Sequence, residues 1–280
     1  MAASAVREID RGWQHVLDNA DPEGAHTLRI GLRRLRVVLH VFRRELDGTA
    51  LAPLGETLAG TARDASRLRD LDVLIGDIVV PLFAVDPVVG GPALIATLEA
   101  DRVVVRAELR RLLTNKDARA LRRKLGDLPP RIEALIARAD TGRALPKMAR
   151  RDLKKRWRKI SRQAADLDAL NTEELHEVRK ALKNLRYAFA SFAPFWGRKT
   201  AVEFEGQLKR LQNAFGYLND VAVAKQLETH AGADAGQTEI NCAIGYVLGW
   251  HTERALRARS RIKEKWQQLG KTKLARELAG

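Results

Sequence analysis

An internal repeat constrains the fold of this chain more than any other feature of its sequence. When the chain is shifted by 150 residues, basic, histidine and aromatic positions of one segment fall on equivalent positions of another. The matched pairs are His26 with His176, Arg29 with Arg179, Arg33 with Lys183, Arg36 with Arg186 and Phe42 with Phe192. The same shift places Leu68, Asp70 and Val73 on Leu218, Asp220 and Val223. The sequence therefore predicts two copies of one structural unit.

The secondary structure is predicted to be helical throughout. Apolar residues recur at helical spacing, whereas alternating strand patterns bounded by turns are hard to find. The expected helices cover residues 22–46, 51–80, 91–114, 117–138, 146–168, 171–195, 198–230 and 236–269, with a shorter one near 5–18. Together with the repeat, this predicts an all-α fold of two four-helix bundles related by a pseudo-twofold axis, divided into residues 1–143 and 144–280.

The charge of the chain indicates an acidic partner. Lys and Arg number 50 against 35 Asp and Glu, a formal net charge of +15. Cys242 is the single cysteine, which excludes an intramolecular disulfide and favours a reducing compartment. Glu8 and Asp10 lie where a signal peptide needs an apolar run, and prolines, glycines and Asp86 interrupt the most apolar region, 78–98. A cytoplasmic protein without a membrane span is expected.

Two of the expected helices carry a basic stripe opposite their apolar face. The first stripe consists of His26, Arg29, Arg33, Arg36 and His40, and the second of His176, Arg179, Lys180, Lys183 and Arg186. From Arg29 to Arg44 there are six arginines and no acid, whereas solvated helices usually intersperse acids. Because the arginine fork grips phosphate oxygens bidentately, phosphate is the expected anion. A solvated surface is the alternative interpretation.

Two further segments are also basic. Residues 147–162 hold nine Lys or Arg and one acid, Asp152. Residues 254–265 are basic as well, but Glu253 and Glu264 dilute their charge. For each segment, a charged, solvated exterior is the alternative to a role in anion binding.

A metal site is another hypothesis for the two histidines. Glu23 with His26, and Glu173 with His176, have the Glu-x-x-His spacing of di-iron helical bundles. Such sites also need a glutamate from each of two further helices, and the repeat does not supply it. Cations on the same face as each histidine would also repel a metal ion, so metal binding is kept as an alternative only.

Signatures of catalysis are scarce. Asp70 and Asp72 look like a metal pair, but two residues apart on a helix they point about 200° away from each other. Asp70 and Asp220 are expected instead to hold a neighbouring basic side chain. Residues 270–272 end like a phosphate-binding loop but lack its earlier glycine, and Cys242 lies in an apolar setting typical of packing. We expect neither an enzyme nor a bound cofactor.

The repeated motifs resemble those of a known family. Segments 26–36 and 176–187, with 68–73, 208–212 and 218–220, resemble the paired signatures of the CHAD family, named for its conserved-histidine α-helical domain. The resemblance extends from about residue 12 to about residue 270. It implies one CHAD domain of two four-helix bundles, with a basic channel between them that binds inorganic polyphosphate.

The resemblance also implies a set of ligand-contacting residues. With Lys180 from the second stripe, the set is His26, Arg29, Arg33, Arg36, His176, Arg179, Lys180, Lys183, Arg186 and Lys209. Asn184 stands where the first copy has Arg34, and Ala222 where it has Asp72, so the two copies need not contribute equally.

The resemblance further implies a cellular context. CHAD proteins are often fused to, or encoded beside, a triphosphatase domain, and the 280 residues are expected to hold the CHAD domain alone. A separate triphosphatase or polyphosphate-metabolising enzyme is therefore an expected partner, and polyphosphate granules are an expected location. A nucleic-acid binder is the alternative that the charge permits, although aromatics are only 5% of the residues and few rings can stack on bases.

Overall fold

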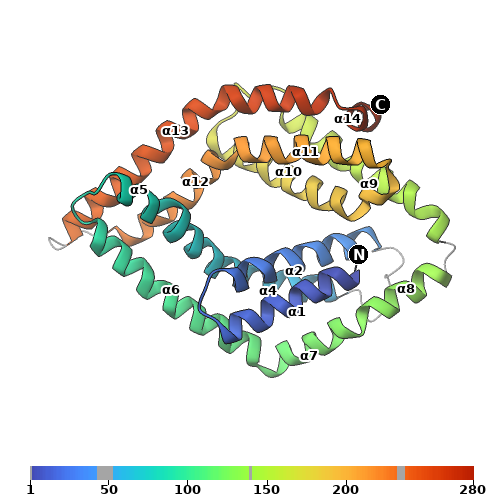
Figure 1. Ribbon diagram of the computed structural model, residues 1–280, viewed down its shortest axis with the longest axis horizontal. Coiled ribbons are helices and arrows are strands. Elements are labelled where there is room, and N and C mark those ends of the chain that lie inside the picture. Colours follow the sequence, from blue (N-terminus) through green and yellow to red (C-terminus); the bar gives the residue numbers. More distant parts are fainter. Residues whose placement is uncertain (1, 43–52, 139–140, 232–236) are drawn as a thin grey trace. The chain divides into compact units, whose positions relative to one another are not determined.

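Every regular element of the described chain is a helix (Figure 1). The computed structural model describes residues 2–42, 53–138, 141–231 and 237–280. The α-helices are α1 (Ala2–Asp18), α2 (Glu23–Val41), α4 (Leu54–Val73), α5 (Val80–Val85), α6 (Gly91–Thr114), α7 (Lys116–Gly126), α8 (Leu128–Arg138), α9 (Thr141–Gln163), α10 (Thr172–Phe192), α11 (Arg198–Ala214), α12 (Gly216–Ala224), α13 (Thr238–Gly270) and α14 (Lys273–Ala279). A π-helical turn, η1 (Leu74–Val79), and two 3-10 turns, η2 (Ala193–Phe195) and η3 (Lys225–His230), complete the order. The predicted all-α fold is confirmed.

Three helices that the sequence predicted as single elements are interrupted. The predicted helix 51–80 consists of α4, η1 and the start of α5. Pro81 lies in the first turn of α5, where its ring and missing N–H disturb the regular helical hydrogen bonds before it. The predicted helix 117–138 divides into α7 and α8 just before Pro129, and the predicted helix 198–230 divides at Phe215. The predicted helical residues 43–46, 51–52 and 236, and most of the predicted loop 231–236, lie outside the described residues.

The chain forms two compact units, and each unit is drawn from separate stretches of sequence. Unit 1 comprises Met1–Arg69, Arg102–Asp152 and Ala190–Phe195, and unit 2 comprises Asp70–Asp101, Leu153–Phe189 and Trp196–Gly280. Helices α4, α6, α9 and α10 each supply residues to both units. The predicted division into residues 1–143 and 144–280 follows the sequence repeat rather than these contacts, and it stays a prediction.

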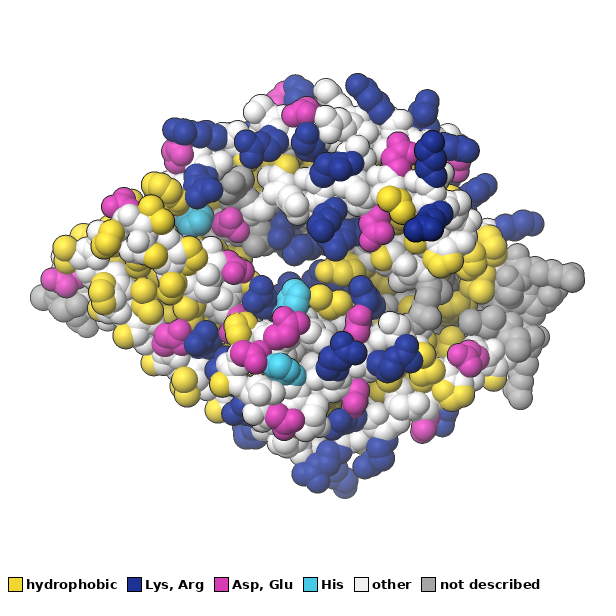
Figure 2. Space-filling model, viewed as in Figure 1, with side chains coloured by type: hydrophobic (Ala, Val, Ile, Leu, Met, Phe, Trp, Pro, Cys, Tyr) yellow, Lys and Arg dark blue, Asp and Glu magenta, His cyan; other side chains and the backbone are white. Residues whose placement is uncertain are grey.

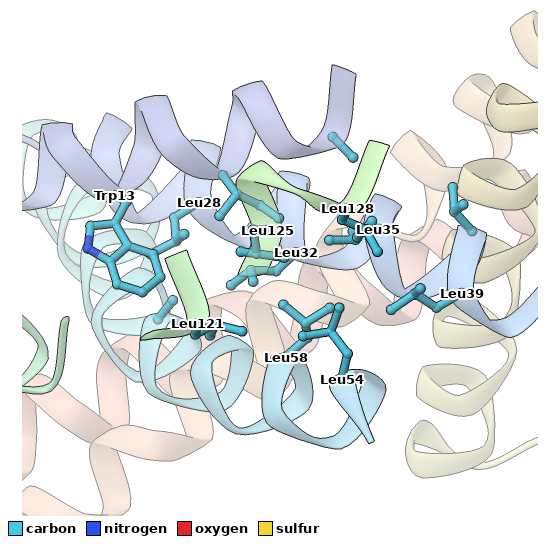
Figure 3. Close-up of a cluster of buried hydrophobic side chains, with 14 of the residues drawn as sticks. Trp13, Leu28, Leu32, Leu35, Leu39, Leu54, Leu58, Leu121, Leu125 and Leu128 are labelled. Carbon is cyan, nitrogen blue, oxygen red and sulfur yellow. The ribbon is translucent and has the colours of Figure 1, made fainter. Parts of the chain in front are cut away.

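The core of unit 1 is an aliphatic cluster around α2 (Figure 3). Leu28, Leu32 and Leu35 of α2 are fully buried, and they belong to one cluster with Trp13 of α1 and Leu58 of α4. Leucines of α7 and α8 join it: Leu121, Leu125 and Leu128. Since each buried leucine contributes about 1.5–3 kcal/mol, this stripe fixes which face of α2 points inward.

Glycines allow α1 and α2 to pack backbone against backbone. A Cβ atom added at Gly12 would lie 2.2 Å from the backbone nitrogen of Leu28. One added at Gly31 would lie 2.7 Å from the backbone nitrogen of Ile9. Neither position leaves room for a side chain, so α1 is held directly against one side of α2.

Unit 2 has an aliphatic core and an aromatic one. The aliphatic core joins η1, α5 and the start of α6 to α12 and α13, and its members include Leu74, Ile78, Leu94, Val223 and Val247. In the aromatic core, the rings of Phe189 on α10 and Phe204 on α11 meet edge to face with centroids 4.9 Å apart. Trp157 of α9 stacks on Trp266 of α13 at 5.4 Å. The aromatic core fixes the inward faces of α9, α10, α11 and α13.

The helices α2 and α10 bury equivalent positions. The buried residues of the first are Ala25, Leu28, Leu32, Leu35, Val38 and Leu39, followed by Phe42, and those of the second are Leu175, Val178, Leu182, Leu185, Ala188, Phe189 and Phe192. Each pair is separated by the 150-residue shift of the repeat. The repeat therefore extends to side-chain packing, and the two helices expose equivalent faces. The pseudo-twofold relation between the copies stays a prediction.

An apolar surface lies at the end of unit 2 that contains α5 (Figure 2). Val80, Val85 and Val89 are exposed in this region, Val85 to 81%. They belong to the most apolar stretch of the sequence, which prolines interrupt. Among the described residues, no helix has the length and apolar character that crossing a membrane requires.

Candidate functional site

The basic stripe of α2 lies opposite its buried leucines in unit 1. His26, Arg29 and Arg33 are half-buried, and Arg36 and His40 are exposed. Partial burial brings the charged groups close to apolar atoms, where water and salt screen an ionic contact less than in open solution. The N-terminal part of this stripe is therefore the better place for a bound anion.

The flanks of the α2 stripe are held by acidic side chains. Arg34 points about 120° away from the stripe and forms an ion pair with Glu8 of α1. At the other end of α2, His40 Nε2 lies 4.0 Å from Asp152 Oδ1 of α9. Arg34 therefore ties α1 to α2 and lies outside the stripe, so Asn184 at the equivalent position of the second copy does not remove a cation from the α10 stripe.

Both stripe-bearing helices begin with a carboxylate at their cap. The Glu23 N–H donates to Asp21 at 2.9 Å, and the hydrogen bond from His15 at 2.8 Å is the main cause that lowers the pKa of Asp21. At α10, the Glu174 N–H donates to the Asn171 side chain at 3.0 Å, and the Glu174 carboxylate accepts from the Asn171 N–H at 2.8 Å. This reciprocal pair is a capping box, and it confirms the predicted start of α10.

The basic stripe of α10 lies in unit 2. His176, Arg179, Lys183 and Arg186 are half-buried, and Lys180 is exposed. Lys180 Nζ donates to Glu177 at 2.7 Å, and this hydrogen bond is the main cause that lowers the pKa of the Glu177 carboxyl. Glu177 is therefore an ionised, cation-paired residue at one edge of the stripe.

The other edge of the α10 stripe contacts α11. Arg186 donates to the side-chain oxygen of Gln212 at 2.5 Å. The predicted ligand residue Lys209 is exposed and lies one turn before Gln212, on the same side of α11. Lys209 therefore lies on the side of α11 from which Gln212 contacts the stripe. The sequence prediction did not include Gln212, although its spacing from Lys209 was a usable signal.

His176 is poised to respond to an anion. Burial is the largest cause that lowers its pKa, and the charges of Lys180 and Arg179 lower the pKa further. Its Nδ1 is buried and has no hydrogen-bond partner among the described residues. Burial and the neighbouring cations therefore disfavour the protonated imidazole in the free protein, and a nearby polyanion would favour it.

The carboxylates singled out from the sequence do not gather at the histidines. In the described ranges, no group of three or more His, Cys, Asp and Glu side chains is arranged to hold a metal ion. Glu23 accepts a hydrogen bond from the Thr27 hydroxyl at 2.7 Å, within its own helix. Asp70 is half-buried whereas Asp72 is only 2% exposed, as their expected separation around the helix requires.

The basic segment 254–265 on α13 has a packing role. Arg259 donates to the backbone carbonyls of Asp168 and Leu170, at 3.2 and 2.8 Å. Lys263 forms an ion pair with the Asp168 side chain. These contacts fasten the connection between α9 and α10, so Arg259 and Lys263 have a structural role at the surface.

The basic segment on α9 differs from that on α13 in presenting a row of exposed cations. Its unit 2 part exposes Lys155, Arg158, Lys159 and Arg162 on one side of the helix, and we call these four residues the α9 ridge. The opposite side is buried through Trp157 and its neighbours. The ridge therefore remains open to solvent along two turns.

Cys242 and Thr272 lie outside the stripes. The structure corrects the prediction for Cys242 and shows the role of Thr272. Cys242 is exposed, so the prediction that it packs in an apolar setting is wrong. Its helix turns the adjacent Ala243 and Ile244 inward instead. Thr272 is buried and accepts a hydrogen bond from the Ala275 N–H at 3.3 Å, which makes residues 270–272 the junction between α13 and α14.

The described structure defines an all-α protein in which two equivalently packed helices each expose a basic face. The chain belongs to the CHAD domain family, which it matches over residues 1–228. The fold is similar to the crystal structure of the CHAD domain from the plant Ricinus communis, with a TM-score of 0.76 and 21% identity over 97% of this chain and 89% of that one. It is also similar to PptA from Streptomyces chartreusis, with a TM-score of 0.61 and 18% identity over 95% of this chain and 96% of that one. Among curated proteins, no match was found.

Proposed function

We propose that this protein binds inorganic polyphosphate through the basic stripes of α2 and α10, without catalysing a reaction. The observation that carries the proposal is the pairing of these stripes, because both lie opposite identically spaced buried residues. The α2 stripe combines histidines with arginines, and the α10 stripe combines one histidine with arginines and lysines. Membership of the CHAD domain family supports the same function through the resemblance described above. The channel between the bundles that this resemblance implies stays a prediction.

The chemistry of the stripes favours phosphate over carboxylate polymers. Arginine donates two parallel hydrogen bonds to phosphate oxygens, and a half-buried guanidinium makes them in a less screened setting. The stripe of α2 contains three arginines and that of α10 two, with further charge from Lys180 and Lys183. A polymer with a charge on every unit can occupy several of these cations at once.

Polyphosphate is expected to bind more tightly as its chain lengthens. A polymer that reaches both stripes makes its second contact intramolecularly, at a high effective concentration, so its overall affinity rises without new contacts. Pyrophosphate lacks this advantage, and we expect its affinity to be weaker by about 100-fold or more. Calorimetric titration with pyrophosphate and with short and long polyphosphate measures the difference. Equal affinity per molecule for pyrophosphate and long chains would contradict binding by both stripes.

Polyphosphate binding is expected to strengthen as the pH falls from 8 to 5.5. The pKa of His176 lies below its ordinary value in the free protein, and a bound polyanion raises it, so binding takes up a proton. Affinity then increases as pH falls between the bound and the free pKa. The stability of the folded protein changes in the opposite direction. The lowered pKa of His176 favours the folded state at neutral pH, and this contribution is lost as the pH falls below about 6.5, the pKa of histidine in the unfolded chain.

The pH dependence can be assigned with histidine variants. Replacing His26 and His176 with Gln should flatten it and leave most of the salt dependence, which belongs to the arginines and lysines. Binding isotherms at both pH values, on the wild type and this variant, make the comparison. Tighter binding at pH 8 would instead support the metal hypothesis, since a ligand histidine must be neutral. Elemental analysis of protein purified without a histidine tag tests that hypothesis independently.

Competition with nucleic acid tests the alternative function. Described aromatic side chains such as Trp157, Phe189 and Phe204 pack against one another, which occupies rings that single-stranded bases would need for stacking. At equal phosphate concentration, polyphosphate is expected to displace a labelled oligonucleotide far more readily than the reverse. The opposite order would favour nucleic acid as the ligand.

We propose that the protein resides in the cytoplasm and associates with polyphosphate granules. A separate triphosphatase or polyphosphate-metabolising enzyme is its proposed partner, because the chain itself is assigned a binding role. Expression of a fluorescent fusion in cells that accumulate polyphosphate tests the location. The fusion should concentrate in granules and disperse when polyphosphate synthesis is blocked.

A further inference from the structure

The α9 ridge is a concentrated basic surface that the proposed binding stripes do not use. Its four side chains are exposed and spaced i, i+3, i+4 and i+7, which places them within about 100° of arc on one face of the helix. The sequence from Leu153 to Gln163 contains no acid. Like charges at i and i+4 destabilise a helix by about 0.2–0.5 kcal/mol per pair. A bound anion would relieve this repulsion.

The ridge adjoins the α10 stripe at Glu177. The charge of Lys159 acts on the Glu177 carboxyl, and Lys180 of α10 donates to the same carboxyl at 2.7 Å. Glu177 therefore has one cation from each helix beside it, and both belong to unit 2. Lys180 is next to Glu177 around the axis of α10, and Arg186 lies at the edge of the stripe farthest from Glu177. Cations of α9 and α10 thus flank Glu177, and basic residues continue around α10 from Lys180 to Arg186.

The ridge belongs to the second copy alone. The helices α1 and α9 bury residues at the same spacing: Ala5, Ile9 and Val16 in α1, and Leu153, Trp157 and Ala164 in α9. This register is a shift of 148 residues, two fewer than the shift that relates α2 to α10, and it matches the ridge to Arg7, Asp10, Arg11 and Gln14 of α1. Asp10 forms an ion pair with Arg122 at 2.7 Å, so the α1 face is mixed in charge and already partnered. The ridge is therefore not a consequence of the repeat.

We propose that the α9 ridge is a second polyphosphate-binding surface, which extends the α10 stripe and is reached by long chains. This inference rests on the proposed function. The ridge extends about 10 Å along the axis of α9. A polymer that runs from the α10 stripe to the ridge must cross from one helix to the other. A flexible, unbranched polyanion can follow that path, whereas double-stranded nucleic acid, with a persistence length of about 50 nm, cannot bend over so short a distance. Exposed lysines and arginines suit such a ligand, because they neutralise phosphates without demanding one geometry.

The test removes the four charges of the ridge and measures polyphosphate binding. The variant is Lys155→Gln, Arg158→Gln, Lys159→Gln and Arg162→Gln, and glutamine keeps a favourable helix propensity at each site. The matched control removes four exposed cations of α7 and α8: Lys116→Gln, Arg123→Gln, Lys124→Gln and Arg131→Gln. Both variants have the same net charge. Circular dichroism and melting temperature check that both remain folded.

The expected result separates long chains from short ones. The ridge variant should bind long polyphosphate about 10-fold or more weakly, with a salt slope lower by about 2 to 3, and bind short polyphosphate as the wild type does. The control should lose little affinity for either. Unchanged long-chain affinity in the ridge variant, or an equal loss in the control, would overturn the inference. Loss of duplex DNA binding with polyphosphate binding intact would assign the ridge to nucleic acid instead. A wild type that binds no polyphosphate would overturn the proposed function itself.

Discussion

Reversing one charge in each stripe, Arg33→Glu with Lys183→Glu, is expected to abolish measurable polyphosphate binding. Each change removes a charge-assisted contact worth about 1.5–3 kcal/mol and adds repulsion, so affinity should fall by about 100-fold or more. Both side chains are only half-buried and lie outside the hydrophobic cores, so the melting temperature should change little. Fluorescence polarisation with labelled long-chain polyphosphate measures the binding, and calorimetry measures the melting temperature.

The control for this variant must avoid basic residues with packing roles. Arg259 is unsuitable, because it holds the carbonyls of Asp168 and Leu170. Lys116→Glu with Lys124→Glu changes the net charge equally at exposed positions of α7, and it should retain most of the affinity. If the double stripe variant unfolds while Arg33→Gln with Lys183→Gln remains folded and binds normally, the stripes have a structural role and the proposed function is wrong.

Replacing Gly12 by Ala is expected to cause a large loss of stability, although it adds a single methyl group. The new Cβ would lie 2.2 Å from a backbone atom of Leu28, which cannot move aside as a flexible side chain can. Overpacking of this kind costs about 1–3 kcal/mol and occasionally more, and separation of α1 from α2 would place this case at the upper end. Urea unfolding followed by circular dichroism should show a clear decrease in the midpoint.

Gly60→Ala provides the opposite expectation in the same unit. Gly60 lies inside α4, and a Cβ there would meet only the distal end of the Arg63 side chain, at 3.9 Å. Alanine at such a helix position stabilises by about 0.5–1 kcal/mol. A Gly12→Ala protein that is as stable as the wild type would contradict the close packing of α1 on α2. A Gly60→Ala protein that is less stable than the wild type would contradict the open surroundings of Gly60 in α4.

The sequence predicts the helices and stripes well because both depend on local periodicity. Leu28, Leu32 and Leu35 are buried as their spacing requires, and Arg29 and Arg33 lie on the opposite side of the same helix. The same reasoning separates Asp70 from Asp72 and places the start of α10 at Asn171. These conclusions need only the geometry of a single helix.

Features that depend on partners distant in sequence were not predictable in this way. The environment of Arg259 is set by backbone carbonyls about 90 residues earlier, and the contact of Arg186 with Gln212 joins two helices. Burial of His176 is likewise a property of its packing. Cys242 shows the limit of local composition, because apolar neighbours turned inward while the cysteine itself remained at the surface.

The discontinuous core of unit 2 has a consequence during protein synthesis. Ile78, Val79, Leu82 and Phe83 are buried in a cluster to which α12 and α13 contribute, and the contributing residues of those helices begin at Val223. At about 5–20 residues per second, a ribosome needs roughly 10 to 30 s to make the intervening chain. During that interval this apolar segment has left the exit tunnel without the helices that cover it. We therefore expect nascent chains to expose the apolar residues of η1 and α5 until α12 and α13 are made, and we expect a protein truncated before α12 to aggregate instead of folding as a smaller domain.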